Sequence, residues 1–181
     1  DGVILGVAAL DLDGFKPVND TYGHEVGDAL LVQIAQRLSA ALRLSDVIAR
    51  VGGDEFIGLF PDVGNRDSLT FLGERLLGVF DTPFEVMGHT LSLSCSIGLV
   101  VAPTDGDDQD SLLKAADDAM YRAKQAGKRR IHLAAIGGDR VAFDAFGRIS
   151  VNGRPAPPST AMPDEGGAAC RNATASGAST A

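Results

Sequence analysis

The chain has 181 residues, of which 45% are hydrophobic and 22% are charged, and this composition is typical of a soluble globular domain. Its formal net charge of −8 argues against nucleic-acid binding, because that function needs clustered Lys and Arg to displace counterions from phosphates. No apolar run reaches the roughly 18 residues that a membrane span requires, so we expect no membrane contact here. Cys95 and Cys170 suggest neither a disulfide framework nor a metal site, which favours a cytoplasmic location.

The first part of the chain predicts a strand, a helix and a hairpin. Val3 to Leu10 is a continuous apolar run, as expected of a central strand. An amphipathic helix is predicted over residues 27–42, where apolar side chains recur at helical spacing: Leu30, Leu31, Ile34, Leu38 and Leu42. Two short apolar runs, residues 46–51 and 56–60, flank a pair of glycines and predict the strands of the hairpin.

The middle of the chain predicts two more helices and two more strands. A helix is expected over residues 69–80, ending near Pro83, and residues 91–99 alternate as in a half-buried strand. After an acidic loop, Asp110 or Ser111 can cap a helix that ends at Gly127. A short strand at residues 131–133 follows. This order predicts an α+β fold in which helices cover a mainly antiparallel sheet.

The composition changes after residue 134. Residues 134–150 contain a few apolar side chains but no convincing period, and residues 155–181 are rich in Pro, Gly, Ala, Ser and Thr. Such segments do not bury enough apolar surface to fold. We therefore expect one folded domain at residues 1–134 and a low-complexity, disordered tail at residues 135–181.

The predicted hairpin tip carries the sequence GGDEF at residues 52–56. Gly52 and Gly53 allow the positive φ angles of a tight turn and let a ligand approach the backbone closely. Asp54 and Glu55 are adjacent like charges that repel each other, so a bound cation is expected beside them. A plain hairpin turn would explain the glycines but not the two carboxylates.

Two further segments make a longer pattern. Residues 11–28 read DLDGFKPVNDTYGHEVGD, and residues 50–56 read RVGGDEF. Together they resemble the DxDxFKxxND…GHxxGD and GGDEF signatures of the GGDEF family, the bacterial diguanylate cyclases, over approximately residues 3–133. The resemblance implies a ferredoxin-like or nucleotide-cyclase-like βααββαβ core at residues 1–134. It also implies condensation of two GTP into cyclic di-GMP with release of two pyrophosphates.

By this resemblance, Asp11, the Leu12 carbonyl and Asp54 hold Mg²⁺ or Mn²⁺, and Glu55 aids metal binding or deprotonates the nucleophile. The catalytic residues would then be Asp11, Asp54 and Glu55. Divalent metal held by carboxylates is the usual way to neutralise charge that develops on a phosphate. The structural alternative is that Asp11 only caps the short helix that follows it.

The resemblance also identifies residues that would bind the guanine base and the phosphates of the substrate. Asn19 and Asp28 match the family's guanine-reading residues, and a carboxylate can accept from both N1–H and the exocyclic amine of guanine. The alternative for Asp28 is that it caps the helix beginning at Ala29. Phe15 and Lys16 match the turn whose backbone amides cradle phosphates, beside the hairpin glycines.

Residues 121–128 read YRAKQAGK and resemble the family's YxAKxxG[RK] segment, in which Lys124 and Lys128 would contact the β- and γ-phosphates. Basic residues at a helix C-terminus also complement the helix dipole, which is the structural alternative. Arg129 stands where the family usually has Asn. Asp13 receives only a supporting role.

Arg43 and Asp46 resemble the family's RxxD inhibitory site for cyclic di-GMP, with Arg75 as its second arginine. Arginine pairs with phosphate and stacks on guanine, while aspartate accepts from guanine. A solvated surface pair is the alternative. A catalytically silent domain that binds GTP or cyclic di-GMP is the alternative function, and a cyclase that makes cyclic AMP or GMP is a further one.

The resemblance implies a homodimer, because each subunit binds one GTP, and an upstream sensor domain. The family's domain usually opens with a helix and a DxLTxLxNR segment, which this chain lacks. We therefore expect the chain alone to bind GTP but to turn it over poorly. The full-length protein could be anchored to a membrane through such a missing N-terminal region.

Overall fold

A five-stranded sheet lies at the centre of the first of two units, which comprise residues 1–139 and 140–181. The computed structural model describes residues 4–135, 141–143, 149–151 and 154–155. The spatial order of the sheet is β2 (Val47–Gly52), β3 (Glu55–Phe60), β1 (Leu5–Asp13), β6 (Ser94–Ala102) and β7 (Arg130–Leu133). Only the β6–β7 pair is parallel within this sheet, so the predicted α+β fold with a mainly antiparallel sheet is confirmed.

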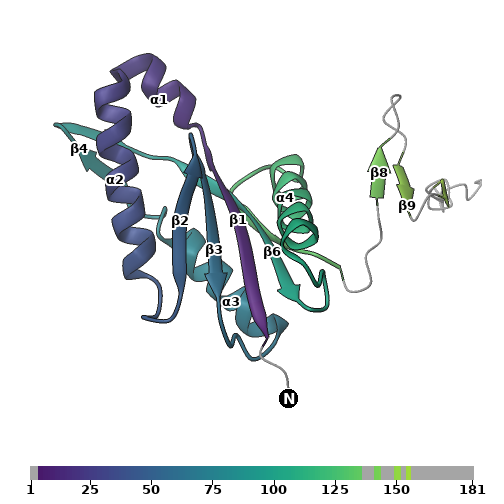
Figure 1. Cartoon of the computed structure of the whole chain (residues 1–181). Helices are drawn as coiled ribbons and strands as arrows, with labels where there is room; N and C mark the ends of the chain where they lie inside the picture. The colour runs from purple at the N-terminus through teal and green to yellow at the C-terminus, as the bar shows by residue number, and fades with distance from the viewer. Residues whose placement is uncertain (1–3, 136–140, 144–148, 152–153, 156–181) are drawn as a thin grey trace, which may run out of the picture. The chain divides into compact units, whose positions relative to one another are not determined.

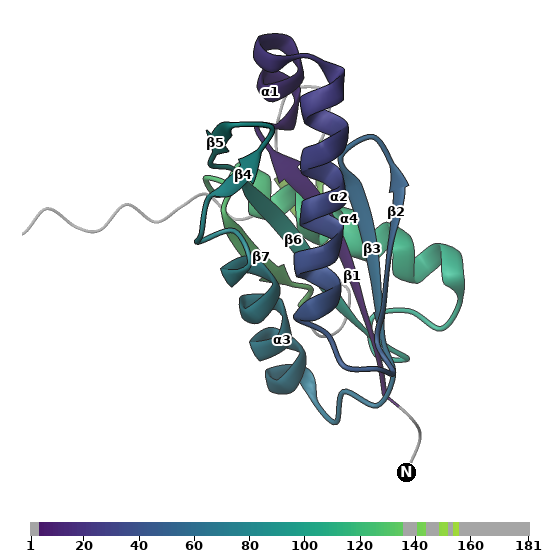
Figure 2. The same cartoon turned by 90° about the vertical axis from the view of Figure 1, so that its left-hand side faces the viewer.

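Helices cover both faces of this sheet (Figures 1 and 2). α2 (His24–Ala40) and α3 (Arg66–Gly78) pack on one face, and α4 (Gln109–Gln125) packs on the other. α1 (Phe15–Tyr22) lies beyond the end of β1. As a result, β1 and β6 are buried on both faces: residues 95–101 of β6 are all buried. The prediction of a half-buried strand at residues 91–99 was therefore wrong, because both layers of helices cover β6.

The strand register brings the ends of several strands together at one end of the sheet. Asp11 at the end of β1 lies opposite Glu55, at the start of β3, and opposite Ser96 of β6 on its other side. β7 begins beside Ser96, because it runs parallel to β6. The β2–β3 tip and α1 therefore lie at the same end of the sheet, away from the N-terminus (Figure 1). We call this end of the sheet, where Asp11, Glu55 and Ser96 lie, the site end.

A glycine sets how closely α4 packs on the sheet. A Cβ atom at Gly98 of β6 would overlap the carbonyl oxygen of Ala116 and the backbone nitrogen of Met120. A side chain at this position would therefore push the helix backbone outward, since interiors pack at crystal-like density. The absence of one lets the C-terminal half of α4 lie directly over β6 and β1.

Several element boundaries differ from the predicted ones. β1 extends to Asp13, and α2 begins at His24 rather than at residue 27, with Gly23 before it. α3 spans residues 66–78 instead of 69–80. The cap of α4 is Asp108, whose side chain accepts from Ser111 N at 2.9 Å in a capping box, so the prediction of Asp110 or Ser111 was wrong.

Sequence analysis missed a second hairpin, β4 (Phe84–Val86) and β5 (His89–Leu91). Leu91 belongs to β5, and β6 begins only at Ser94, so the predicted strand at residues 91–99 is two strands. This hairpin and its approach dock on α2. Arg37 donates to the carbonyls of Thr82 and Pro83 at 2.7 and 2.8 Å, and its guanidinium lies 3.9 Å from the centre of the Phe84 ring.

The described residues of the second unit form three short antiparallel strands, β8 (Val141–Phe143), β9 (Ile149–Val151) and β10 (Arg154–Pro155), in the order β10–β9–β8. Sequence periodicity did not indicate them. The disordered tail predicted at residues 135–181 includes the segments that form these strands; for its residues outside the described ranges, disorder stays a prediction. None of the helices that the structure describes is long and apolar enough to cross a membrane.

Candidate functional site

Two acidic residues from different strands face each other at the site end. Asp11 and Glu55 are direct partners in the antiparallel β1–β3 register, so their side chains leave the sheet on the same face. A backbone hydrogen bond also holds the hairpin tip beside the end of β1: Leu12 N donates to the Asp54 carbonyl at 3.1 Å. Residues 11–12 and 54–55 are far apart in the sequence but close in space, as the prediction of a shared metal site requires.

The hairpin tip is held by an arginine that sequence analysis did not single out. Arg50 Nε donates to the Gly53 carbonyl at 2.8 Å, within the tip itself. Gly53 has a positive φ of 35°, but Gly52 does not, so the prediction of positive φ holds for one glycine only. A β-bulge between Arg50 and Gly52 provides the rest of the turn.

Lys124 of α4 reaches over the sheet to Asp11. Its Nζ lies 2.7 Å from Asp11 Oδ2, and the side chains are 30% and 14% exposed. Burial raises the pKa of Asp11 above its ordinary value, and repulsion by Asp54 and Asp13 adds to the shift. The hydrogen bond and the charge of Lys124 oppose it only in part. The site end is thus a place where negative charge is crowded and a cation is favoured.

The donor chemistry fits a hard divalent cation, since Asp11, Asp54, Glu55 and the Leu12 carbonyl offer only oxygen. Among the described residues, however, no three His, Cys, Asp or Glu side chains already converge as a metal site. Lys124 supplies the positive charge beside Asp11 instead. The alternative that Asp11 caps α1 is excluded, because Gly14 occupies the N-cap position and Asp11 lies within β1.

The predicted guanine readers lie on α1 and α2. Asn19 Oδ1 is buried and has no hydrogen-bond partner among the described residues. Such an acceptor is costly to leave unpaired, so a hydrogen-bond donor such as water or a bound group would stabilise it. Gly27 makes room for it, since a Cβ there would overlap Asn19 Oδ1, and sequence analysis assigned Gly27 no role. Asp28 is exposed inside α2, so the alternative that it caps a helix was wrong.

The start of α1 follows directly from the end of β1. Gly14 has a left-handed φ of 91° and allows the sharp turn between them. Phe15 is buried in the core and anchors the first turn, while Lys16 is exposed. Among the residues that the structure describes, no side chain caps this helix, so its first-turn amides are suited to an anionic group.

The second predicted phosphate contact lies just beyond α4. Lys128 is exposed in the turn that joins α4 to β7, at the site end. Gly127, Lys128 and Arg129 have consecutive positive φ angles of 112°, 60° and 45°. The backbone N–H of Arg129 donates to Asp13 Oδ2 at 3.1 Å. The loop that carries Lys128 is therefore fastened to β1.

The predicted inhibitory residues lie elsewhere. Arg43 and Asp46 precede β2, and Val47 pairs with Leu59, so they lie at the opposite end of this hairpin from Gly52. The Asp46 carboxylate accepts from Arg43 N at 2.9 Å, which makes a local turn. Among the described residues, no hydrogen bond or ion pair joins either residue to Arg75, which is exposed on α3.

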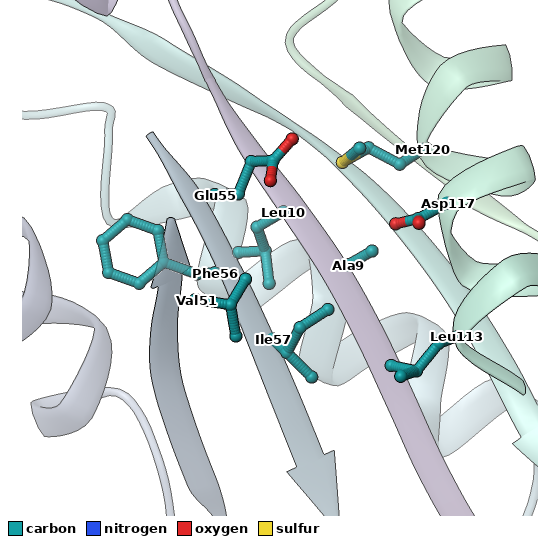
Figure 3. A pocket seen from close by; sticks show the side chains of 9 residues that line it. All are labelled: Ala9, Leu10, Val51, Glu55, Phe56, Ile57, Leu113, Asp117 and Met120. Atoms are coloured by element: carbon teal, nitrogen blue, oxygen red, sulfur yellow. The ribbon is translucent and has the colours of Figure 1, made fainter. Parts of the chain in front are cut away.

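A pocket of about 190 Å³ lies between β1, β3 and α4 (Figure 3). Ala9, Ile57 and Leu113 make it apolar, and Glu55 and Asp117 place two carboxylates on its wall. Burial raises the pKa of Asp117, with repulsion by Asp118. Ligand pockets usually measure roughly 300–1,000 Å³, so this one is small. It adjoins the site end through Glu55 and does not enclose a nucleotide.

Comparison with known proteins gives a relative that combines two named activities. The chain is 44% identical over 124 residues to the bifunctional diguanylate cyclase/cyclic di-GMP phosphodiesterase MucR of Pseudomonas aeruginosa. That alignment covers 68% of this chain but only 18% of MucR, so the chain spans less than a fifth of this relative.

Solved structures show the same fold. The GGDEF domain of PA1120 (YfiN or TpbB) from Pseudomonas aeruginosa is 36% identical, with a TM-score of 0.71, over 74% of this chain and 84% of that one. The GGDEF domain of DgcB from Caulobacter crescentus, solved in complex with c-di-GMP, is 27% identical, with a TM-score of 0.67, over 74% and 79%. The family described as "Diguanylate cyclase, GGDEF domain" matches residues 2–130. The chain therefore belongs to the GGDEF domain family.

Proposed function

We propose that this domain is a diguanylate cyclase, which condenses two GTP molecules into cyclic di-GMP and releases two pyrophosphates. The observation that carries the proposal is the register pairing of Asp11 with Glu55, with Lys124 placed 2.7 Å from Asp11. Attack of a 3′-hydroxyl on an α-phosphate needs a proton acceptor, oxygen ligands for a cation and positive charge near the phosphates. All three are available at the site end.

The acidic residues have two proposed roles, which are metal binding and proton acceptance. Asp11, Asp54 and the Leu12 carbonyl would hold Mg²⁺ or Mn²⁺, with Glu55 as a further ligand. When bound, the cation would neutralise negative charge that develops during phosphoryl transfer. Glu55 is exposed and unpaired in β3 as the structure describes it, and it would accept the proton of the attacking hydroxyl.

The remaining residues would bind the nucleotide. Asn19 and Asp28 would accept from the guanine edge, and the orphaned Oδ1 of Asn19 supports this assignment. The first-turn amides at Phe15 and Lys16 and the hairpin backbone at Gly52 and Gly53 would approach the phosphates. Lys124 and Lys128 would meet the β- and γ-phosphates from α4 and its following turn.

Synthesis of a cyclic dinucleotide joins two substrates, and this domain has one set of these residues. The proposed active enzyme is therefore a homodimer in which two copies face each other, each with one GTP. Because the chain spans 18% of MucR, a sensor domain elsewhere in the full protein belongs to the proposal. A cytoplasmic location, where GTP is available, is part of it as well.

We also propose that cyclic di-GMP inhibits through Arg43 and Asp46, with Arg75 as a second arginine. The local turn between Arg43 N and Asp46 leaves the Arg43 side chain exposed. Added cyclic di-GMP should slow the parent without competing with GTP, and Arg43→Ala should relieve this while leaving turnover intact. Equal inhibition of both proteins would return Arg43 to a solvated surface role.

The deciding experiment is product analysis after incubation with GTP and Mg²⁺, with ATP as the control substrate. Cyclic di-GMP from GTP and nothing from ATP is the expected result. Because monomers should be poorly active, the assay is run over a range of concentrations, and also with a parallel coiled coil fused before Asp1. Nucleotide binding with no product from either protein at any concentration would support a silent binding domain instead.

A further inference from the structure

The backbone of the turn after α4 adopts an unfavourable conformation. Three consecutive residues, Gly127, Lys128 and Arg129, have positive φ angles, and only the first is glycine. The left-handed region is sterically unfavourable for a non-glycine residue, so two such residues in a row need compensating contacts. Such local strain is often found where a side chain must be presented in one direction.

The contacts that stabilise this turn come from several places. Lys128 N donates to the Ala123 carbonyl at 3.1 Å, which closes the end of α4, and Arg130 Nε donates to the Lys128 carbonyl at 3.0 Å. Both are local contacts. Arg129 makes two long-range contacts: its backbone N–H donates to Asp13 Oδ2 at 3.1 Å, and its guanidinium pairs with Asp81 Oδ1 at 3.0 Å.

Asp13 is itself rigidly oriented. Ser94 Oγ donates to its Oδ2 at 3.0 Å, and the fully buried Ser96 donates to its Oδ1 at 2.9 Å. Within the part of the chain that the structure describes, the donors that reach this carboxylate are hydroxyls of β6 and one backbone amide. A carboxylate that accepts several oriented hydrogen bonds is well suited to fix a neighbouring backbone segment.

We propose that Asp13 is a positioning residue for nucleotide binding, which holds the Gly127–Arg129 turn against β1 so that Lys128 is presented to the triphosphate. Asp13 makes no contact with substrate in this role and acts through the Arg129 backbone. The proposal rests on the function proposed above for Lys128. It goes further by assigning a task to the second aspartate of the 11–13 segment.

The test separates turn order from phosphate binding. Asp13→Ala should increase amide hydrogen exchange at residues 126–130 without nucleotide. It should also weaken binding of a non-hydrolysable GTP analogue about tenfold, the size of one lost hydrogen bond to a charged group. Binding of GMP, which lacks the β- and γ-phosphates, should change little. Asp81→Ala is the matched control, since it removes only the exposed contact to the Arg129 side chain and should leave both readouts unchanged.

A rescue variant distinguishes positioning from a general structural role. Asn and Gly adopt the left-handed region more readily than Arg, so Arg129→Asn or Arg129→Gly lowers the conformational cost of the turn. In the Asp13→Ala background, either change should restore most of the lost affinity for the analogue. A variant that is merely less well folded would show no such recovery.

The outcomes distinguish a failure of the role proposed for Asp13 from a failure of the function proposed for Lys128. Unchanged exchange at residues 126–130 in Asp13→Ala would overturn the positioning role, whatever the activity. Raised exchange with unaltered affinity for the analogue would overturn the link from Asp13 to phosphate binding. Lys128→Ala identifies the cause of that second result: if it also binds the analogue normally, the failure lies in the function proposed for Lys128. Weaker binding by Lys128→Ala would show that the failure lies in the role proposed for Asp13.

Discussion

Lys124 Nζ lies 2.7 Å from Asp11 Oδ2, and this ion pair joins the last turn of α4 to the end of β1. The two residues are 113 positions apart, and both were assigned from family signatures to different parts of one substrate site. The pair places the lysine that we propose for phosphate binding beside a carboxylate that we propose for metal binding. If both assignments are correct, residues on the α4 face of the sheet bind both the metal and the phosphates.

Glu55→Gln should abolish most turnover, because it retains the shape of the side chain but removes the charge that would accept a proton and bind metal. We expect the rate of cyclic di-GMP synthesis to fall by at least about 100-fold, the usual effect of losing a principal electrostatic group. Glu74→Gln on the exposed side of α3 is the control and should behave as the parent. A folded, dimeric Glu55→Gln protein with the parental rate would refute the mechanism.

The stability of the domain should carry a pH dependence that originates at Asp11. Its pKa is raised in the folded protein from an ordinary value of 3.8, chiefly by burial, so the folded state binds this proton more tightly than the unfolded state. The stability from Asp11 is therefore fully present below pH 3.8 and is lost as the pH rises through the raised value.

Urea unfolding of the parent and of Asp11→Asn across this acidic range tests the sign. The parent's free energy of unfolding, relative to the variant, should decrease as the pH rises toward neutral and then level off. A relative stability that increases with pH would mean that Lys124 dominates and that the pKa of Asp11 is lowered. Constant relative stability would show no shift at all.

Gly98→Ala should move α4 away from the sheet. The added methyl would meet the backbone of Ala116 and Met120, which cannot rotate aside. Overpacking of this kind costs about 1–3 kcal/mol, and here it should also lengthen the Lys124–Asp11 contact and lower turnover. Chemical denaturation measures the first effect. Gly78→Ala is the control, because its new methyl meets only ordinary contacts and stability should hardly change.

Gly27→Ala should impair nucleotide binding without unfolding the domain. Alanine is preferred to glycine inside a helix by up to about 1 kcal/mol, which offsets part of the new crowding. The methyl would displace Asn19 Oδ1, so affinity for GTP should fall about tenfold, as when a hydrogen bond is lost. In an Asn19→Ala background the same change should do no further harm. Equal losses of GTP affinity in both backgrounds would show that Gly27 does not act through Asn19 in guanine recognition.

Local rules were sufficient for much of the architecture. Alternation, helical spacing and turn residues predicted β1, α2, the β2–β3 hairpin, α3 and α4, because each pattern depends on neighbours in the chain. Errors occurred where a boundary depends on distant contacts. Leu91 continues the alternation of residues 93–99, yet it pairs with Phe84 in a separate hairpin that docks on α2.

The sequence alone determined the family signatures, and with them which carboxylates, amides and lysines deserved testing, because those signatures are runs of residues within short segments. The meeting of these segments was decided by the tertiary structure. The register of β1 against β3 and β6 sets Asp11 beside Glu55, and the missing side chain at Gly98 brings α4 close to the sheet. The orphaned Asn19 Oδ1 and the hydrogen bonds to Asp13 likewise follow from backbone positions up to 116 residues apart, which no local pattern encodes.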